Sequence, residues 1–131
     1  MIPIDKYKKI RNRILRDKGD LIFFGLILRE DAPDIWDLVV SAPWAEADTW
    51  SALQYLSEVV KTELEPAEIL QLSRVVILEG DNPVLQALLS ALKVTGNSVA
   101  EYLDSTIGGI HFRHAYVLEA KNSVPEGASA A

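Results

Sequence analysis

The chain contains no cysteine among its 131 residues. Disulfide frameworks, thiolate nucleophiles, zinc ribbons and iron–sulfur centres are therefore excluded. A chain of this length corresponds to one domain, and a hydrophobic content of 49% is enough to fill one core. Because the apolar residues are spread along the whole chain, the composition predicts a folded protein and not a disordered one.

Long apolar runs are also lacking. The longest are Leu21–Leu28 and Val75–Leu78, whereas a helix that crosses a bilayer needs about 20 apolar residues. The first residues carry charges with no apolar stretch behind them, which does not fit a secretory signal. The sequence therefore predicts a cytoplasmic protein without membrane association.

Charge is present in quantity but is unevenly distributed. The formal net charge is −6. Residues 1–20 carry seven Lys or Arg against three acids, a local charge of +4, and residues 21–131 carry six bases against sixteen acids, a charge of −10. A basic segment on an acidic body indicates contact with a charged partner.

The first part of the chain predicts one helix followed by a β-hairpin. Residues 3–18 place apolar side chains on one helical stripe and basic side chains opposite it. Residues 21–30 form an apolar run typical of a strand that is covered on both faces. The turn residues Asp31–Asp34 separate this run from a second strand at 35–42, and so short a connection favours antiparallel pairing.

The rest of the chain alternates helices and strands. The pattern predicts a helix from Asp48 to about Glu63, a helical turn from Pro66 to about Leu72, an interior strand at 74–79, a helix from Pro83 to about Leu92 and a last strand at 110–120. Residues 98–107 fit either a helical turn or a short strand. Residues 121–131 lack periodicity and predict a flexible C-terminal tail.

These elements together predict an α/β or α+β fold. We expect a single mixed sheet of about 4–5 strands with an N-terminal helix, a β-hairpin and two strand–helix–strand crossovers. Residues 1–120 are expected to form a single compact domain, with the tail outside it.

The basic face of the first helix is the first candidate site. It is formed by Lys6, Lys9, Arg13 and Arg16. Such a face can be a solvated outer surface, which is the ordinary case for a surface helix. It can also bind nucleic-acid phosphates or an acidic protein surface. The −10 body opposes nucleic acid, so contact with the acidic surface of a second copy is the more favourable of the two binding interpretations.

The three tryptophans form the second candidate, because Trp36, Trp44 and Trp50 lie within fifteen residues. Trp44 follows the end of a predicted strand, where open α/β sheets place ligands. It can serve as a ligand platform, an interface anchor or a lid over the core. Ser41 lies beside it, but the G-x-S-x-G sequence of a nucleophile elbow is absent, so Ser41 fits a turn better than a catalytic role.

The segment His111–His114 is the third candidate. On a strand, positions i and i+3 point to opposite faces, so the two histidines cannot share a metal ion. His114 lies on the apolar face, and His111 with Arg113 makes the more plausible polar or anion-binding site. The acidic cluster Glu30–Asp37 lacks the ligand order of a calcium loop, and Gly80–Pro83 caps a helix without the Lys of a nucleotide loop. No cofactor or metal is predicted.

These features favour a protein-interaction or accessory module that binds a protein partner or itself as a homodimer, and they favour it over an enzyme. The alternative is a small-molecule-binding protein or small enzyme with a site near Ser41, Trp44, His111 and Arg113. The third hypothesis is nucleic-acid binding through Lys6, Lys9, Arg13 and Arg16.

Overall fold

The computed structural model describes residues 2–30, 34–96, 98–107 and 109–121. Its elements follow along the chain in this order: α1 (Ile4–Asp17), β1 (Phe23–Leu28), β2 (Trp36–Ser41), α2 (Pro43–Ala47), α3 (Thr49–Glu63), α4 (Pro66–Ile69), β3 (Leu72–Ile77), α5 (Pro83–Ala91), β4 (Ala100–Ile107) and β5 (Ile110–Ala120). None of the helices in these ranges is long and apolar enough to cross a membrane.

The strands form one five-stranded mixed sheet in the order β3-β2-β1-β5-β4. β2 and β3 are parallel, and the other neighbouring pairs are antiparallel. This is the predicted mixed sheet with an N-terminal helix, an α+β fold. The predicted hairpin is confirmed by the β1–β2 register, which pairs Phe23 with Ser41 and Leu26 with Leu38. Residues 31–33 of its turn lie outside the described residues.

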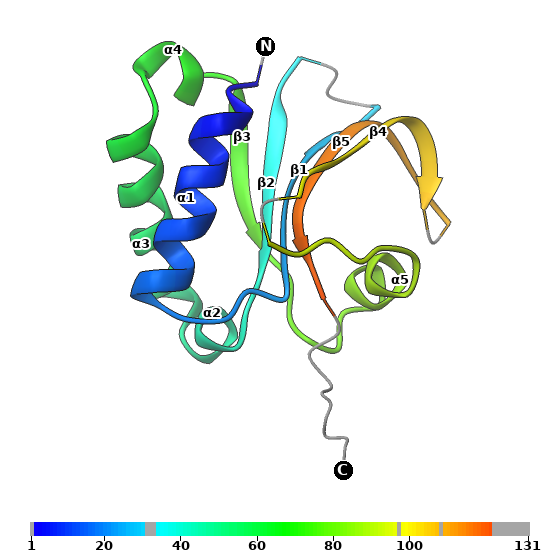
Figure 1. Cartoon of the computed structure of the whole chain (residues 1–131), viewed down its shortest axis with the longest axis horizontal. Coiled ribbons are helices and arrows are strands. Elements are labelled where there is room, and N and C mark those ends of the chain that lie inside the picture. The colour runs from blue at the N-terminus through cyan, green and yellow to red at the C-terminus, as the bar shows by residue number, and fades with distance from the viewer. Residues whose placement is uncertain (1, 31–33, 97, 108, 122–131) are drawn as a thin grey trace.

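Helices cover both faces of the sheet. Figure 1 shows α1 and α3 on one side, and α5 on the other, inside the curve of β4 and β5. One core cluster joins the first set of helices to Phe24, Leu38 and Val40, and a second joins α5 to Phe23 and Val39. Consecutive residues of β1 therefore enter opposite cores, which explains why its apolar run is continuous and every residue of it is buried.

The apolar stripe predicted for α1 is confirmed, with one addition. Tyr7, Ile10 and Ile14 are fully buried against the sheet. Arg11 is fully buried as well and donates a hydrogen bond from Nη1 to the carbonyl oxygen of Leu118 at 3.0 Å. Burial lowers the pKa of Arg11, and the nearby charge of Glu119 raises it in part. α1 thus holds the sheet by a polar contact as well as by apolar packing.

The helix α5 begins where the sequence predicts it. Asn82 is its N-cap, and the side-chain Oδ1 accepts a hydrogen bond from the backbone N–H of Val84 at 2.8 Å. Pro83 follows at the first helical position. Leu85 and Leu88 are buried against the second core cluster.

The interior position predicted for the strand at 74–79 is wrong, because β3 lies at an edge of the sheet. Its apolar residues are accounted for by both core clusters: Val75 packs against the first, and Val76 against the second. The apolar content of a strand shows that its two faces are covered, and it does not show whether other strands pair with it on both sides.

Residues 98–107 fitted either a helical turn or a strand in the sequence. In the structure they contain the strand β4, which lies at the opposite edge of the sheet. Residues 122–131 of the predicted tail lie outside the described residues.

Asp37, the last residue of the acidic cluster noted in the sequence, is buried in the sheet. Its carboxylate lies 3.0 Å from Nε of Arg29 and 3.3 Å from Nε of Arg74. Arg29 directly follows β1, and Arg74 belongs to β3. These two strands lie on either side of β2. This carboxylate therefore joins three adjacent strands at one end of the sheet.

Candidate interaction surface

The basic face of α1 is partly used inside the molecule. Nζ of Lys6 lies 2.7 Å from Oε1 of Glu68 in α4, and Nη1 of Arg13 lies 3.4 Å from Oε2 of Glu63 in α3. Two of the four predicted interaction residues thus hold α1 against its neighbouring helices. Lys9 and Arg16 are exposed, and Arg16 also lies 3.4 Å from Asp17.

The Lys6–Glu68 pair is ionised at neutral pH. The hydrogen bond from Lys6 lowers the pKa of the Glu68 carboxyl, and the same bond raises the pKa of Lys6. The backbone N–H of Glu65 also donates to Glu68, at 2.8 Å. Because these partners come from within the chain, Lys6 has less freedom to meet an external anion than its position in the sequence suggests.

Ser41 and Trp44 lie together at one end of the sheet. The indole Nε1 of Trp44 donates to the carbonyl oxygen of Asp20 at 3.1 Å, and its ring meets Tyr55 edge-on with centroids 5.9 Å apart. Ser41 is only 1% exposed. Its Oγ has no hydrogen-bond partner within the described part of the chain.

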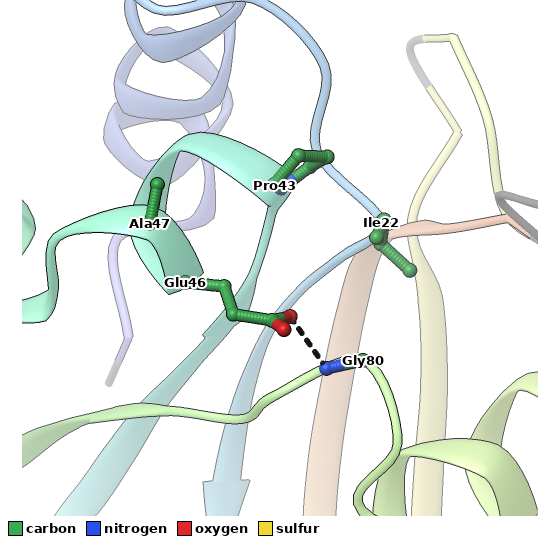
Figure 2. Close-up of a pocket in the computed structure, with 5 residues that line it drawn as sticks. All are labelled: Ile22, Pro43, Glu46, Ala47 and Gly80. Carbon is green, nitrogen blue, oxygen red and sulfur yellow. Dashed lines mark hydrogen bonds between the residues drawn. The ribbon is translucent and has the colours of Figure 1, made fainter.

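An open hollow of about 480 Å³ lies near this end of the sheet, lined by Ile22, Pro43, Glu46, Ala47 and Gly80. Figure 2 shows Glu46 reaching from α2 across the hollow toward Gly80, at the end of the segment that follows β3. Oε1 of Glu46 accepts a hydrogen bond from the N–H of Gly80 at 2.7 Å. The carboxylate that could serve a ligand here already joins two segments of the chain.

His111 and Arg113 lie at the start of β5, whereas the Ser41 end of the sheet is near Ala120. Phe23 pairs with both Ser41 and Ala120, and seven strand residues from Arg113 to Ala120 span about 23 Å. The structure therefore does not bring the four residues of the predicted small-molecule site together. His111 lies 3.1 Å from Thr106 through Nδ1 and 3.3 Å from Asp104 through Nε2, and the Arg113 side chain is exposed.

His114 has a separate set of partners. Its Nε2 lies 2.8 Å from Oε2 of Glu101, and its ring centroid lies 5.1 Å from that of Trp36 and 4.7 Å from that of Tyr116. Trp36 is buried in the core cluster that also contains Leu38. Among the described residues, no three His, Asp or Glu side chains are arranged to hold a metal ion.

Two further hollows lie along α3 and the edge strand β3. One, of about 330 Å³, is lined by Trp50, Leu53, Gln54, Ser57, Glu58 and Lys61. The other, of about 220 Å³, is lined by Ser57, Val60, Lys61, Ile69, Leu72, Ser73, Arg74 and Val75. Because they share Ser57 and Lys61, they form one continuous surface, which we call the α3–β3 strip.

The α3–β3 strip combines exposed apolar side chains with charged ones of both signs, since Glu58 lines one hollow and Lys61 lines both. Trp50 at one end is 70% exposed, and Leu70, next to the other end, is 78% exposed. The part beside β3 has two bases, Lys61 and Arg74, and no acid among its lining residues. Arg74 is paired with Asp37, at 3.3 Å from Nε to Oδ1.

Sequence reasoning singled out Trp50 but placed it with the other two tryptophans, and it did not single out Lys61. A usable signal was present: Trp50, Ser57 and Lys61 recur at intervals of seven and four residues, which is one stripe of a helix. Comparison with protein-family models, with curated proteins and with solved structures gives no match.

Proposed function

We propose that this protein is a protein-interaction module that associates with a second copy of itself. The observation that carries the proposal is the α3–β3 strip, which has a 70%-exposed tryptophan at one end and residues of the edge strand β3 along its other part. Large exposed aromatic side chains are characteristic anchors of protein interfaces. An edge strand also offers unpaired backbone groups to a partner.

The competing hypotheses have weaker support. A small-molecule or catalytic site built from Ser41, Trp44, His111 and Arg113 would need residues from opposite ends of β5 to meet. Nucleic-acid binding would need the basic face of α1, where Lys6 and Arg13 already have carboxylate partners. A protein that binds its own copy needs neither arrangement.

Sedimentation equilibrium of the full chain tests the proposal. We expect a concentration-dependent monomer–dimer equilibrium at micromolar concentrations, with a Kd that changes with salt because charged side chains line the strip. A monomer at every concentration up to about 1 mM, at both low and high salt, would contradict self-association. A parallel titration with labelled DNA and RNA at low salt tests the third hypothesis, since phosphate contacts are strongest there.

A further inference from the structure

The two edges of the sheet are differently suited to pairing with another strand. β4 carries Glu101 and Asp104, and Asp104 has a φ of 48°, which interrupts its pairing with β5. Charges and irregularities of this kind protect an edge from pairing. β3 carries one charged residue, Arg74, and its register shift lies at its beginning, so Val75–Ile77 continue as regular strand.

The backbone of β3 fixes which groups face outward. The N–H of Leu78 donates to the carbonyl oxygen of Val40 in β2 at 2.9 Å. Alternate residues of a strand in a ladder face the same neighbour, so Val76 also bonds to β2. The N–H and C=O groups of Val75 and Ile77 therefore point away from the sheet, where a further strand could bond to them.

We infer that the second copy pairs with this edge: β3 joins β3 of the other copy in antiparallel fashion, about a two-fold axis at Val76. This inference rests on the proposed self-association and assigns its surface. Each Val75 then lies opposite Ile77 of the second copy, a pairing that allows about four backbone hydrogen bonds. The two five-stranded sheets become one continuous sheet.

Charge complementarity selects this register. With Val76 on the axis, Ser73 lies opposite Glu79 of the second copy. Ser73 and Lys61 line the same hollow, so the exposed carboxylate of Glu79 approaches the ammonium group of Lys61. The two-fold axis produces this pair twice. Opposite charges placed in this way fix the register and speed association.

The position of α3 relative to β3 is consistent with the same two-fold axis. Three strand residues from Ser73 to Val76 span about 10 Å, and about 10 Å along α3 corresponds to six or seven residues. α3 and β3 run in opposite directions, so the helical position beside Val76 is near residue 55, about midway between Trp50 and Lys61. An antiparallel approach of the two α3 helices about this axis places Trp50 beside Lys61 of the second copy, where the ammonium group can lie on the indole ring.

Charge reversal with mixing tests the assignment. Lys61→Glu and Glu79→Lys each place like charges together in a homodimer, so sedimentation equilibrium at low salt should give a Kd at least tenfold weaker than wild type. In an equimolar mixture, Glu at position 61 of one variant meets Lys at position 79 of the other, and the second pair keeps its native charges. The mixture should therefore dimerise with a Kd near that of wild type.

A backbone variant tests the strand pairing. Val75→Pro removes an N–H that points away from β2, so the fold should survive, as far-UV circular dichroism would verify, while dimerisation weakens at least tenfold. Lys9→Glu on α1 is the matched control for charge and should leave the Kd unchanged. If Lys9→Glu disrupts the dimer, the basic face of α1 is the interface and the β3 assignment is wrong.

The failures of the two proposals are distinguishable. A wild-type chain that stays monomeric contradicts self-association itself. A wild-type dimer whose Kd is unchanged by Lys61→Glu, Glu79→Lys and Val75→Pro contradicts only the β3 assignment. Two weakened variants whose mixture does not recover also contradict it, because the recovery requires direct contact between positions 61 and 79.

Discussion

Arg11 donates a hydrogen bond from Nη1 to the carbonyl oxygen of Leu118, 107 residues further along the chain, at 3.0 Å. Leu118 is the residue that the β1–β5 register passes over, since Phe24 pairs with Glu119 and Gly25 with Val117. A bulge leaves backbone groups without a ladder partner. The fully buried guanidinium of Arg11 donates the hydrogen bond that the carbonyl oxygen of Leu118 would otherwise lack. This bond attaches α1 to the sheet at the bulge in β5.

Replacing Arg11 by Met should lower the free energy of unfolding by about 2–4 kcal/mol, because a buried carbonyl loses its donor and Glu119 loses a nearby cation. Urea denaturation followed by circular dichroism would measure the change. Lys9→Met, at an exposed position of the same helix, is the control and should change stability by less than about 0.5 kcal/mol. Equal stability of the two variants would mean that another group satisfies Leu118.

Glu119 predicts a dependence of stability on pH. Burial raises its pKa; the charges of Lys121 and Arg11 lower it in part, and Asp20 raises it. A carboxyl whose pKa is higher in the folded state stabilises the fold fully below its unfolded value, about 4.3, and this contribution is lost as the pH rises through the folded value.

The variant Glu119→Gln should therefore gain stability relative to wild type as the pH rises from 4 to 7. Comparing the two proteins by urea denaturation at both pH values isolates this residue from the other carboxyl groups. A difference in free energy that is the same at pH 4 and pH 7 would show that folding does not change the pKa of Glu119.

Gly25 is required by the close approach of β1 and β5. A Cβ at this position would lie 2.9 Å from the carbonyl oxygen of Tyr116 and 3.1 Å from the ring of Phe23. Gly25→Ala should therefore cost about 1–3 kcal/mol of stability, measured by thermal or urea unfolding. Gly80→Ala is the matched control: its nearest atom is the carboxylate end of Glu46 at 3.3 Å, which can move. A Gly25→Ala protein as stable as the Gly80→Ala protein would contradict the tight packing.

Local signals in the sequence were enough for the parts of the fold that depend on neighbouring residues. The stripe that includes Ile10 and Ile14 predicted the buried face of α1, and the turn at Gly80–Pro83 predicted the start of α5. The short connection between β1 and β2 predicted their antiparallel pairing. Each of these features is decided within a few residues, so the sequence carries it directly.

Features decided over long distances could not be predicted in this way. Whether Lys6 faces solvent depends on Glu68, 62 residues away, and whether Arg11 is buried depends on a bulge in β5. The edge position of β3 depends on the order of strands, which apolar content does not encode. The α3–β3 strip needs both α3 and that edge, so it emerges only when the elements are assembled.

Ser41 offers the last test, because it was a candidate site residue and its hydroxyl is buried without a partner among the described residues. A buried hydroxyl that makes no hydrogen bond costs free energy, so Ser41→Ala should keep or raise stability by up to about 1 kcal/mol in urea denaturation. The control is Ser51→Ala, which removes a hydroxyl bonded to Asp48 at 2.9 Å and should not stabilise. A clear loss of stability in Ser41→Ala would mean that the hydroxyl has a partner. Because the proposed interface lies on α3 and β3, the dimer Kd of Ser41→Ala should equal that of wild type.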